Sequence, residues 1–128
     1  MVFLDTSFLI DLAHDVQSAR GRLDGLVETH TAYSVPAPVY FKLHADLSPK
    51  GPRSLRFFRQ LERYSETPLT RKDAEAAAEI EKELAAAGLT IGTVDLLIAG
   101  MCRSHRERLL TADPDFKNVR GLKVDVYR

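Results

Sequence analysis

Three aspartates in this chain stand where carboxylates can do chemistry. Asp5 follows the apolar run Val2–Leu4 at the start of the chain. Asp113 follows a second apolar run at residues 109–111, and Asp95 is the one charge inside a strongly apolar segment. In open α/β sheets, ligands bind at the edge formed by the carboxyl ends of the strands. If the sheet is doubly wound, all three aspartates can lie at that edge.

A cluster of carboxylates needs a cation, because two of them 4 Å apart repel by about 4 kcal/mol at an effective dielectric constant of 20. Hard oxygen ligands with open positions suit Mg²⁺ or Mn²⁺. Such an ion lowers the pKa of a bound water and offsets charge on a scissile phosphate. The three aspartates therefore predict metal-assisted hydrolysis of a phosphodiester.

Each aspartate also has a purely structural interpretation. Asp5 can cap the helix that follows it, and Asp95 can interact with the dipole at the start of its own helix. Asp113 can be an ordinary acid of a turn, since residues 112–115 have turn composition. The joint occurrence of the three at equivalent places favours a metal site.

The composition is that of one globular domain spanning residues 1–128, with 45% hydrophobic and 28% charged residues. Lys plus Arg and Asp plus Glu number 18 each, so a polyanion has to be met by a local basic patch. The single cysteine, Cys102, excludes an internal disulfide and fits a reducing compartment. No apolar run is long enough for a membrane span or a signal peptide, and we expect a cytoplasmic protein.

Hydrophobic periodicity and turn residues predict strands alternating with helices, which indicates an α/β fold with a central parallel sheet flanked by helices on both faces. The predicted strands are 2–4, 31–35, 109–111 and 124–127, with a short extended piece near 66–69. Six helices are predicted. The first begins after Asp5, the second ends near Glu28, and the third begins at Pro36 to Pro38. The fourth covers 55–64, the fifth runs from Thr70 to Ala87, and the sixth begins at Thr93. Residues 48–52 read as a loop.

Three helix starts carry local signals. Thr6 or Ser7 can cap the first helix, and Thr70 with Asp73 resembles a capping box. Thr93 is the predicted N-cap of the apolar helix, which places Asp95 at position N2. That helix is apolar on nearly every side, so it should be buried.

Four short motifs, in this order, resemble those of PIN-domain ribonucleases, most closely the VapC-type toxins of prokaryotic toxin–antitoxin pairs. They are Leu4-Asp5-Thr6-Ser7, Gly92-Thr93-Val94-Asp95-Leu96-Leu97-Ile98-Ala99, Leu110-Thr111-Ala112-Asp113-Pro114-Asp115-Phe116, and Gly121-Leu122-Lys123-Val124. Each motif alone is weak, whereas the series of four extends over the whole chain and is fairly specific.

The resemblance implies an endoribonuclease that depends on Mg²⁺ or Mn²⁺, forms a homodimer, and is blocked by a VapB-like antitoxin. It implies that Asp5, Asp95 and Asp113 are the metal-binding and catalytic acids. The resemblance also implies that certain polar positions line the site, namely Thr6, Ser7 and Thr111, with Asp115 as a more variable accessory acid.

The chain departs from the family at Lys42, where such proteins usually carry a glutamate in the helix after the second strand. An ammonium beside a divalent ion lowers metal affinity through charge repulsion. Lys42 can instead fold onto Asp5 or Asp95 as a counter-ion, or pair with Asp46 one turn further on. Three interpretations stay open: a substitution that disables a toxin, a degenerate member that only binds, and an enzyme that works with the remaining acids.

A basic stripe is predicted on the helix at 55–64, where it could hold an RNA backbone or simply form a solvated face. It consists of Arg53, Arg56, Arg59 and Arg63. The four histidines do not have zinc-ligand spacing, and Cys102 reads as a core residue.

Other enzyme classes have little support. The sequence has no phosphate-binding loop of the Gly-x-x-x-x-Gly-Lys type and no Gly-x-Ser-x-Gly elbow. A phospho-aspartyl enzyme would use Asp5 as nucleophile, but that chemistry normally has a second aspartate where this chain has Ser7. The main alternative to a nuclease is an inactive PIN-like module that dimerises and engages an antitoxin.

Overall fold

The computed structural model describes residues 1–47 and 51–128, and so leaves out most of the predicted loop at 48–52. The described strands are β1 (Val2–Leu4), β2 (Tyr33–Pro36), β3 (Glu66–Thr67), β4 (Arg108–Thr111) and β5 (Val124–Val126). The described helices are α1 (Thr6–Ala13), α2 (Gln17–Glu28), α3 (Ala37–Asp46), α4 (Pro52–Leu61), α5 (Arg71–Ala86), α6 (Thr93–His105) and the 3₁₀ helix η1 (Pro114–Asn118).

All strand pairs of the described sheet are parallel, in the order β3-β2-β1-β4-β5. The two central strands, β1 and β4, pair Leu4 with Leu110. The backbone amide of Asp5 then donates to the carbonyl of Leu110 at 3.0 Å. This register brings the residues that follow β1 beside the end of β4, which is where the predicted site lies.

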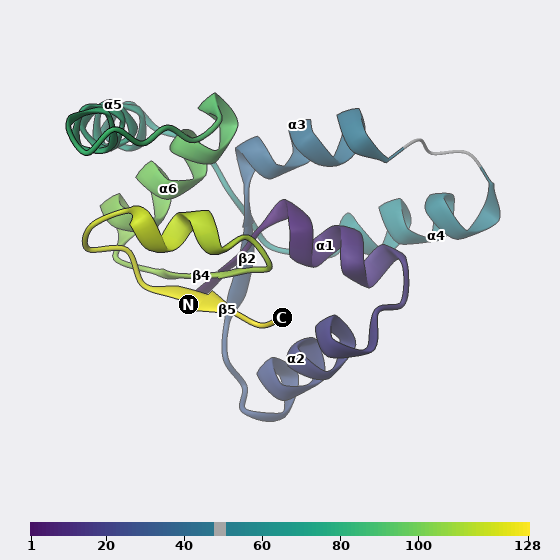
Figure 1. Ribbon diagram of the computed structural model, residues 1–128. Helices are drawn as coiled ribbons and strands as arrows, with labels where there is room; N and C mark the ends of the chain where they lie inside the picture. The colour runs from purple at the N-terminus through teal and green to yellow at the C-terminus, as the bar shows by residue number, and fades with distance from the viewer. Residues whose placement is uncertain (48–50) are drawn as a thin grey trace.

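The strand order places helices on both sides of the sheet. The chain moves outward from β1 through β2 to β3, returns to β4, and then continues to β5. Because parallel crossovers are right-handed, this reversal sends the connections to opposite faces. In Figure 1, α5 and α6 lie at the upper left with η1 just above β4 and β5, whereas α1 and α4 lie to the right of β2, α2 at the lower right and α3 at the top. The predicted fold class is therefore confirmed.

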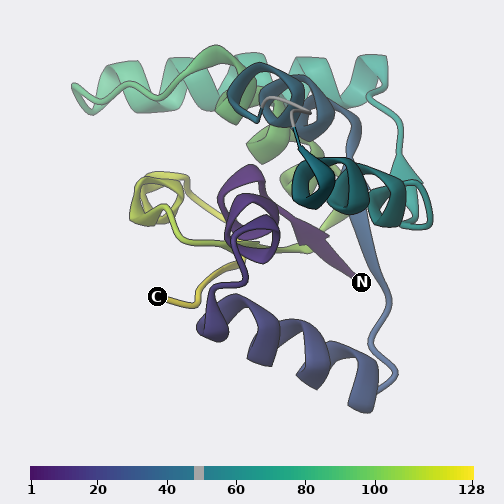
Figure 2. The same cartoon turned by 90° about the vertical axis from the view of Figure 1, so that its right-hand side faces the viewer.

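The core consists of the two central strands and the helices packed on them. Phe3, Leu4, Leu109 and Leu110 are almost fully buried, as expected for strands covered on both faces. Figure 2 shows α1 in the middle of the molecule, seen nearly along its axis, with α2 below it. α6 is buried over much of its length, as its apolar composition predicts.

α5 and α6 pack so closely that a glycine is required between them. A Cβ atom added to Gly100 would lie 2.5 Å from the carbonyl oxygen of Asp73 and 2.7 Å from the amide nitrogen of Ala77. Both atoms belong to the backbone of α5, which cannot move aside as a side chain can. The helix pair is therefore a tightly fitted unit.

Several predicted boundaries are confirmed, and others shift by a few residues. The capping box at the start of α5 is confirmed, since the Thr70 amide donates to Asp73 at 2.9 Å and the Thr70 hydroxyl accepts from the Asp73 amide. β2 is one or two residues later than predicted. α4 begins and ends three residues earlier than predicted, because Pro52 is favoured in a first helical turn. The predicted turn at 112–115 continues into η1.

Thr6 or Ser7 as the cap of α1 and Thr93 as the cap of α6 are wrong, whereas the alternative of Asp5 at the N-cap of α1 is right in position. Asp5 is the N-cap residue of α1, although its side chain makes no capping hydrogen bond, and Thr6 is already helical. α6 has Gly92 as its N-cap, so Asp95 occupies N3 and not N2. In both cases the residue before the expected cap has the extended backbone that ends the preceding segment.

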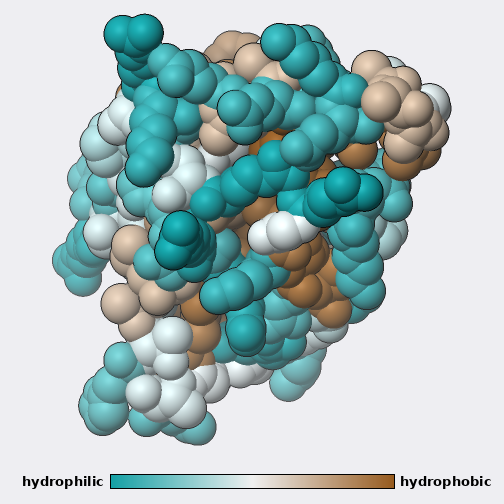
Figure 3. Space-filling model, turned by 90° about the vertical axis from the view of Figure 1, so that its left-hand side faces the viewer, coloured by the Kyte–Doolittle hydropathy of each residue, from teal (hydrophilic) through white to brown (hydrophobic). Residues whose placement is uncertain are grey.

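The face of the molecule that carries α5 and η1 has an apolar hollow. Figure 3 shows brown apolar atoms exposed between teal polar side chains on this side. A cavity of about 380 Å³ lies between the C-terminal half of α5 and residues 118–120, and Ile80, Leu84 and Val119 are part of its lining. Among the described residues, no helix is long and apolar enough to cross a membrane.

Candidate active site

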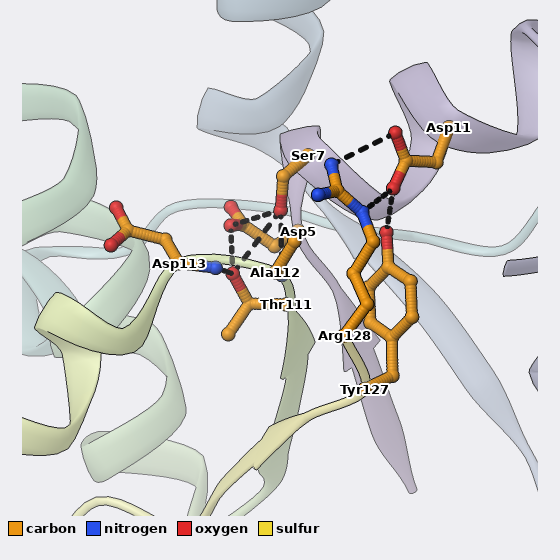
Figure 4. A network of polar contacts seen from close by, with 8 residues as sticks. All are labelled: Asp5, Ser7, Asp11, Thr111, Ala112, Asp113, Tyr127 and Arg128. Atoms are coloured by element: carbon orange, nitrogen blue, oxygen red, sulfur yellow. Dashed lines mark hydrogen bonds and ion pairs between the residues drawn. The ribbon is translucent and has the colours of Figure 1, made fainter. Parts of the chain in front are cut away.

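The Asp5 carboxylate is the centre of a hydrogen-bond network at the ends of β1 and β4 (Figure 4). Its Oδ2 atom accepts from the Thr111 hydroxyl at 2.6 Å and from the Ser7 hydroxyl at 3.2 Å. Ser7 Oγ in turn accepts from the Ala112 amide at 2.9 Å. Thr111 and Ser7 therefore fix one oxygen of the Asp5 carboxylate.

Burial dominates the electrostatics of Asp5, which is only 3% exposed. Burial raises the pKa of the Asp5 carboxyl, the hydrogen bond from Thr111 opposes this rise, and the charge of Asp95 adds to it. Lys42 acts in the opposite direction as a nearby positive charge. Asp5, Asp95 and Lys42 thus lie close enough for their charges to interact.

Asp113 joins the network through its backbone. Its amide donates to Thr111 Oγ1 at 3.0 Å, while its carboxylate accepts from the Asp115 amide at 2.9 Å and so caps η1. In Figure 4 the Asp113 carboxylate lies apart from that of Asp5. Asp115 itself is exposed. Asp113 thus has the turn role considered for it and also stands at the predicted edge of the sheet.

Asp95 is paired with Lys42. The Lys42 ammonium donates to Asp95 Oδ1 at 3.1 Å, and the side chains are 33% and 18% exposed. Partial burial lowers the pKa of Lys42, but the hydrogen bond and charge of Asp95, together with the charges of Asp5 and Asp46, leave it above its usual value. Among the partners considered for Lys42, the structure selects Asp95, and Asp46 contributes only a more distant charge.

Two donor atoms of this site are free to bind a divalent cation. Asp5 Oδ1 and Thr6 Oγ1 are buried, and neither has a hydrogen-bond partner in the described part of the chain. Buried polar atoms are normally satisfied, so an unpartnered carboxylate oxygen points to a ligand. No three His, Cys, Asp or Glu side chains among the described residues already stand together as a metal-binding group. Asp95 is instead paired with the Lys42 ammonium.

Comparison of the sequence with models of protein families identifies the family of this chain. The PIN-domain family model matches residues 2–122, which is nearly the whole chain. The chain belongs to the PIN-domain family. No curated protein matches the sequence.

Solved structures share the fold of this PIN domain at low sequence identity. VapBC2 from Rickettsia felis, bound to a DNA fragment from its promoter, aligns with a TM-score of 0.85 at 22% identity and covers 98% of both chains. A toxin–antitoxin complex from Klebsiella pneumoniae has a TM-score of 0.79 at 19% identity and covers 100% of this chain and 98% of that one. Mycobacterium tuberculosis VapC20, a toxin that cleaves the sarcin–ricin loop, has a TM-score of 0.65 at 16% identity, covering 94% and 95%.

A second buried acid near the site of this PIN domain has no counterpart in the sequence-based prediction. Asp11, one turn after Ser7 on α1, accepts from the Tyr127 hydroxyl and from Arg128 Nε, the latter at 2.5 Å. Figure 4 shows this group beside the Asp5 network. The amphipathic pattern of α1 offers one signal, since Asp11 lies on its buried part. Nothing local indicates partners 116 and 117 residues away.

The four arginines predicted to form a basic stripe on α4 have different neighbours. Arg53 forms an ion pair with Asp15 at 2.5 Å, and Asp15 also pairs with Arg20 at 3.3 Å. Arg56 lines the same polar cavity as these residues, whereas Arg59 lies further round the helix. Arg63 follows the end of α4. All four arginines are exposed, so they are available to a polyanion.

Cys102 is a core residue, as predicted. It is 1% exposed, and burial raises the pKa of its thiol far above the usual value. The histidines take separate roles: His44 stacks on Phe58, and His105 lies 3.3 Å from the Asp73 carboxylate.

Proposed function

We propose that this PIN domain is a metal-dependent endoribonuclease, the toxin of a type II toxin–antitoxin pair, with metal affinity reduced by Lys42. The observation that carries the proposal is the buried Asp5 carboxylate, which has one oxygen fixed by Thr111 and Ser7 and the other without a partner. Family membership supports the activity, and VapC20 of the same fold is a toxin that cleaves RNA.

In this proposal Asp5, Asp95 and Asp113 hold Mg²⁺ or Mn²⁺, which supplies an activated water and offsets charge on the scissile phosphodiester. Thr111 and Ser7 keep the Asp5 carboxylate oriented, because both hydroxyls donate to its Oδ2 atom. Arg53, Arg56, Arg59 and Arg63 bind the RNA backbone. Replacing Arg56 or Arg59 with alanine should weaken RNA binding equally for all sequences, since phosphate contacts carry no base information.

Lys42 determines how active the chain is. Its ion pair with Asp95 at 3.1 Å neutralises one of the three acids and places a positive charge where the cation would enter. This contact also favours the second candidate function, a catalytically inactive PIN-like module that binds partners only. The two candidates differ in one respect, since only a nuclease regains cleavage when a glutamate replaces the lysine.

Cleavage of a labelled single-stranded RNA in Mn²⁺ or Mg²⁺ tests the proposal on three proteins: the unchanged chain, Lys42→Glu, and Lys42→Glu combined with Asp5→Asn. Cutting by the Lys42→Glu protein that disappears in the double variant supports a nuclease weakened at one position. An inert Lys42→Glu protein that binds Mn²⁺ would contradict the nuclease and support the binding module.

The partners follow from the same proposal. Structures of this fold include VapBC and other toxin–antitoxin complexes, so we propose a VapB-like antitoxin as partner. We also propose that the protein is cytoplasmic and forms a homodimer. Light scattering of the purified protein would test the homodimer. A monomer at micromolar concentration would contradict the dimer without bearing on the cleavage assay.

A further inference from the structure

A second cavity lies between α3, α4 and β3, on the side of α3 away from Lys42. Its volume is about 370 Å³, within the range of small-ligand sites. The lining combines aromatic rings with two carboxylates: Tyr40, His44, Phe58, Leu61, Glu62, Tyr64 and Glu66. With about 100° between successive helical residues, Tyr40 and Lys42 project about 200° apart on α3. The cavity is therefore separate from the acidic site.

The aromatic part of the cavity is already organised. His44 and Phe58 stack with ring centroids 4.7 Å apart and planes at 21°. Tyr64 is fixed against Tyr33 in an edge-to-face contact at 5.6 Å, and it is half-buried. Flat rings held in this way present faces on which a planar cationic group can stack.

The two carboxylates of the cavity have no positively charged partner within the described part of the chain. Glu62 and Glu66 are exposed, and neither forms an ion pair with another residue of the described chain. Burial, and then the charge of Glu66, raise the pKa of the Tyr40 hydroxyl, so this phenol stays neutral and close to that carboxylate. Two uncompensated carboxylates beside stacked rings attract a cation and repel a phosphate.

We infer that this cavity binds an arginine side chain presented by a partner protein. A guanidinium is planar, stacks on aromatic faces, and donates hydrogen bonds to carboxylates in a fixed fork, so it matches rings and glutamates together. An ammonium matches the charges but stacks less well, and an apolar side chain leaves Glu62 and Glu66 uncompensated. Phe41, which is 68% exposed on the adjacent outer surface of α3, offers the partner an apolar contact.

This inference does not rest on nuclease activity, and a peptide titration tests it. The ¹⁵N-labelled protein is titrated with acetyl-Gly-Arg-Gly-amide and followed by amide chemical shifts. Matched peptides carry citrulline, which is isosteric with arginine but neutral, or lysine, or norleucine. Glu62→Gln and Glu66→Gln remove one charge each, and Glu79→Gln on the exposed side of α5 is the control variant.

We expect saturable shifts in residues 40–44 and 58–66 with the arginine peptide at millimolar concentration. The citrulline peptide and each of the two cavity variants should bind about tenfold more weakly, because each lacks a charge-assisted hydrogen bond. The control variant should bind as the unchanged protein does.

The inference would be overturned by equal affinity for arginine and citrulline, by shifts confined to another surface, or by no saturable shift at millimolar peptide. Uridine monophosphate that binds in this cavity while the arginine peptide does not would also overturn it and would indicate a nucleotide site. Lysine binding as tightly as arginine would reject the guanidinium and leave a general cation site. The dispersion of the amide spectrum shows for each variant that the fold is intact.

Discussion

Thr111→Val removes one hydroxyl that connects three parts of the candidate site while keeping the shape of the side chain. In the folded protein, Thr111 Oγ1 donates to Asp5 Oδ2 at 2.6 Å and accepts from the Asp113 amide at 3.0 Å. It also lies 3.2 Å from Ser7 Oγ. Thr111 is fully buried, so water cannot replace these contacts.

The cost follows from these contacts. A hydrogen bond to a charged group contributes about 1.5–3 kcal/mol, and a buried backbone donor left without a partner costs about 1–3 kcal/mol. Ser7 still donates to Asp5, so part of the loss is recovered. We expect Thr111→Val to lower the free energy of unfolding by about 2–4 kcal/mol.

Urea denaturation at neutral pH measures this change, and Thr111→Ser is the matched control. The serine variant keeps the hydroxyl and loses one buried methyl group, which costs about 1 kcal/mol. A valine variant as stable as the serine variant would refute the assignment of Thr111 as the residue that holds Asp5 in place.

Four further changes have expected outcomes. Gly100→Ala should lower the free energy of unfolding by about 1–3 kcal/mol in urea denaturation, because the new methyl group meets the α5 backbone at 2.5 Å. Gly21→Ala, which meets nothing within 4 Å in α2, should be neutral or stabilising. The pKa of Asp11 is lowered, since hydrogen bonds from Arg128 and Tyr127 outweigh its burial. The Asp11 carboxylate therefore stabilises the folded protein fully above its pKa in the unfolded chain, which is near 4, and this stabilisation is lost as the pH falls through its pKa in the folded protein. In urea denaturation, Asp11→Asn should therefore lower the free energy of unfolding most at pH 7, and the difference from the unchanged protein should shrink below about pH 4. Lys42→Met should raise Mn²⁺ affinity about tenfold or more in calorimetric titration, since it removes the positive charge without adding a ligand.

The sequence alone predicts much of the framework of the site, because the signals are local. The apolar run of β1 ends at Asp5, and the parallel arrangement follows from the alternation of strands and helices. The Thr70 capping box begins α5, and Gly88, with a φ of 73°, follows its C-cap Ala87. The end of β1 and the capping box each depend on residues close together in the sequence, and the parallel arrangement depends only on the order of the elements.

Contacts between distant parts of the chain could not be predicted in the same way. The partners of Asp11 are more than 100 residues away, and no pattern in α1 names them. Whether the Asp113 side chain caps η1 or faces Asp5 depends on a turn geometry that residue types do not fix. The cap positions of α1 and α6 were missed by one residue, because an extended residue before a helix serves as the cap whatever its side chain.

The pairing of Lys42 with Asp95 explains how a cluster of acids can persist in this fold without a divalent ion. Asp5 and Asp95 interact unfavourably, and the ammonium opposes both charges from α3. A tethered cation is always present at its site, whereas a free ion stabilises the folded state only in proportion to its concentration. The lysine that we propose to reduce metal affinity would therefore also make the stability of the folded chain less dependent on metal. In a member with glutamate at this position the relation reverses, since a third carboxylate adds repulsion that only a bound cation relieves.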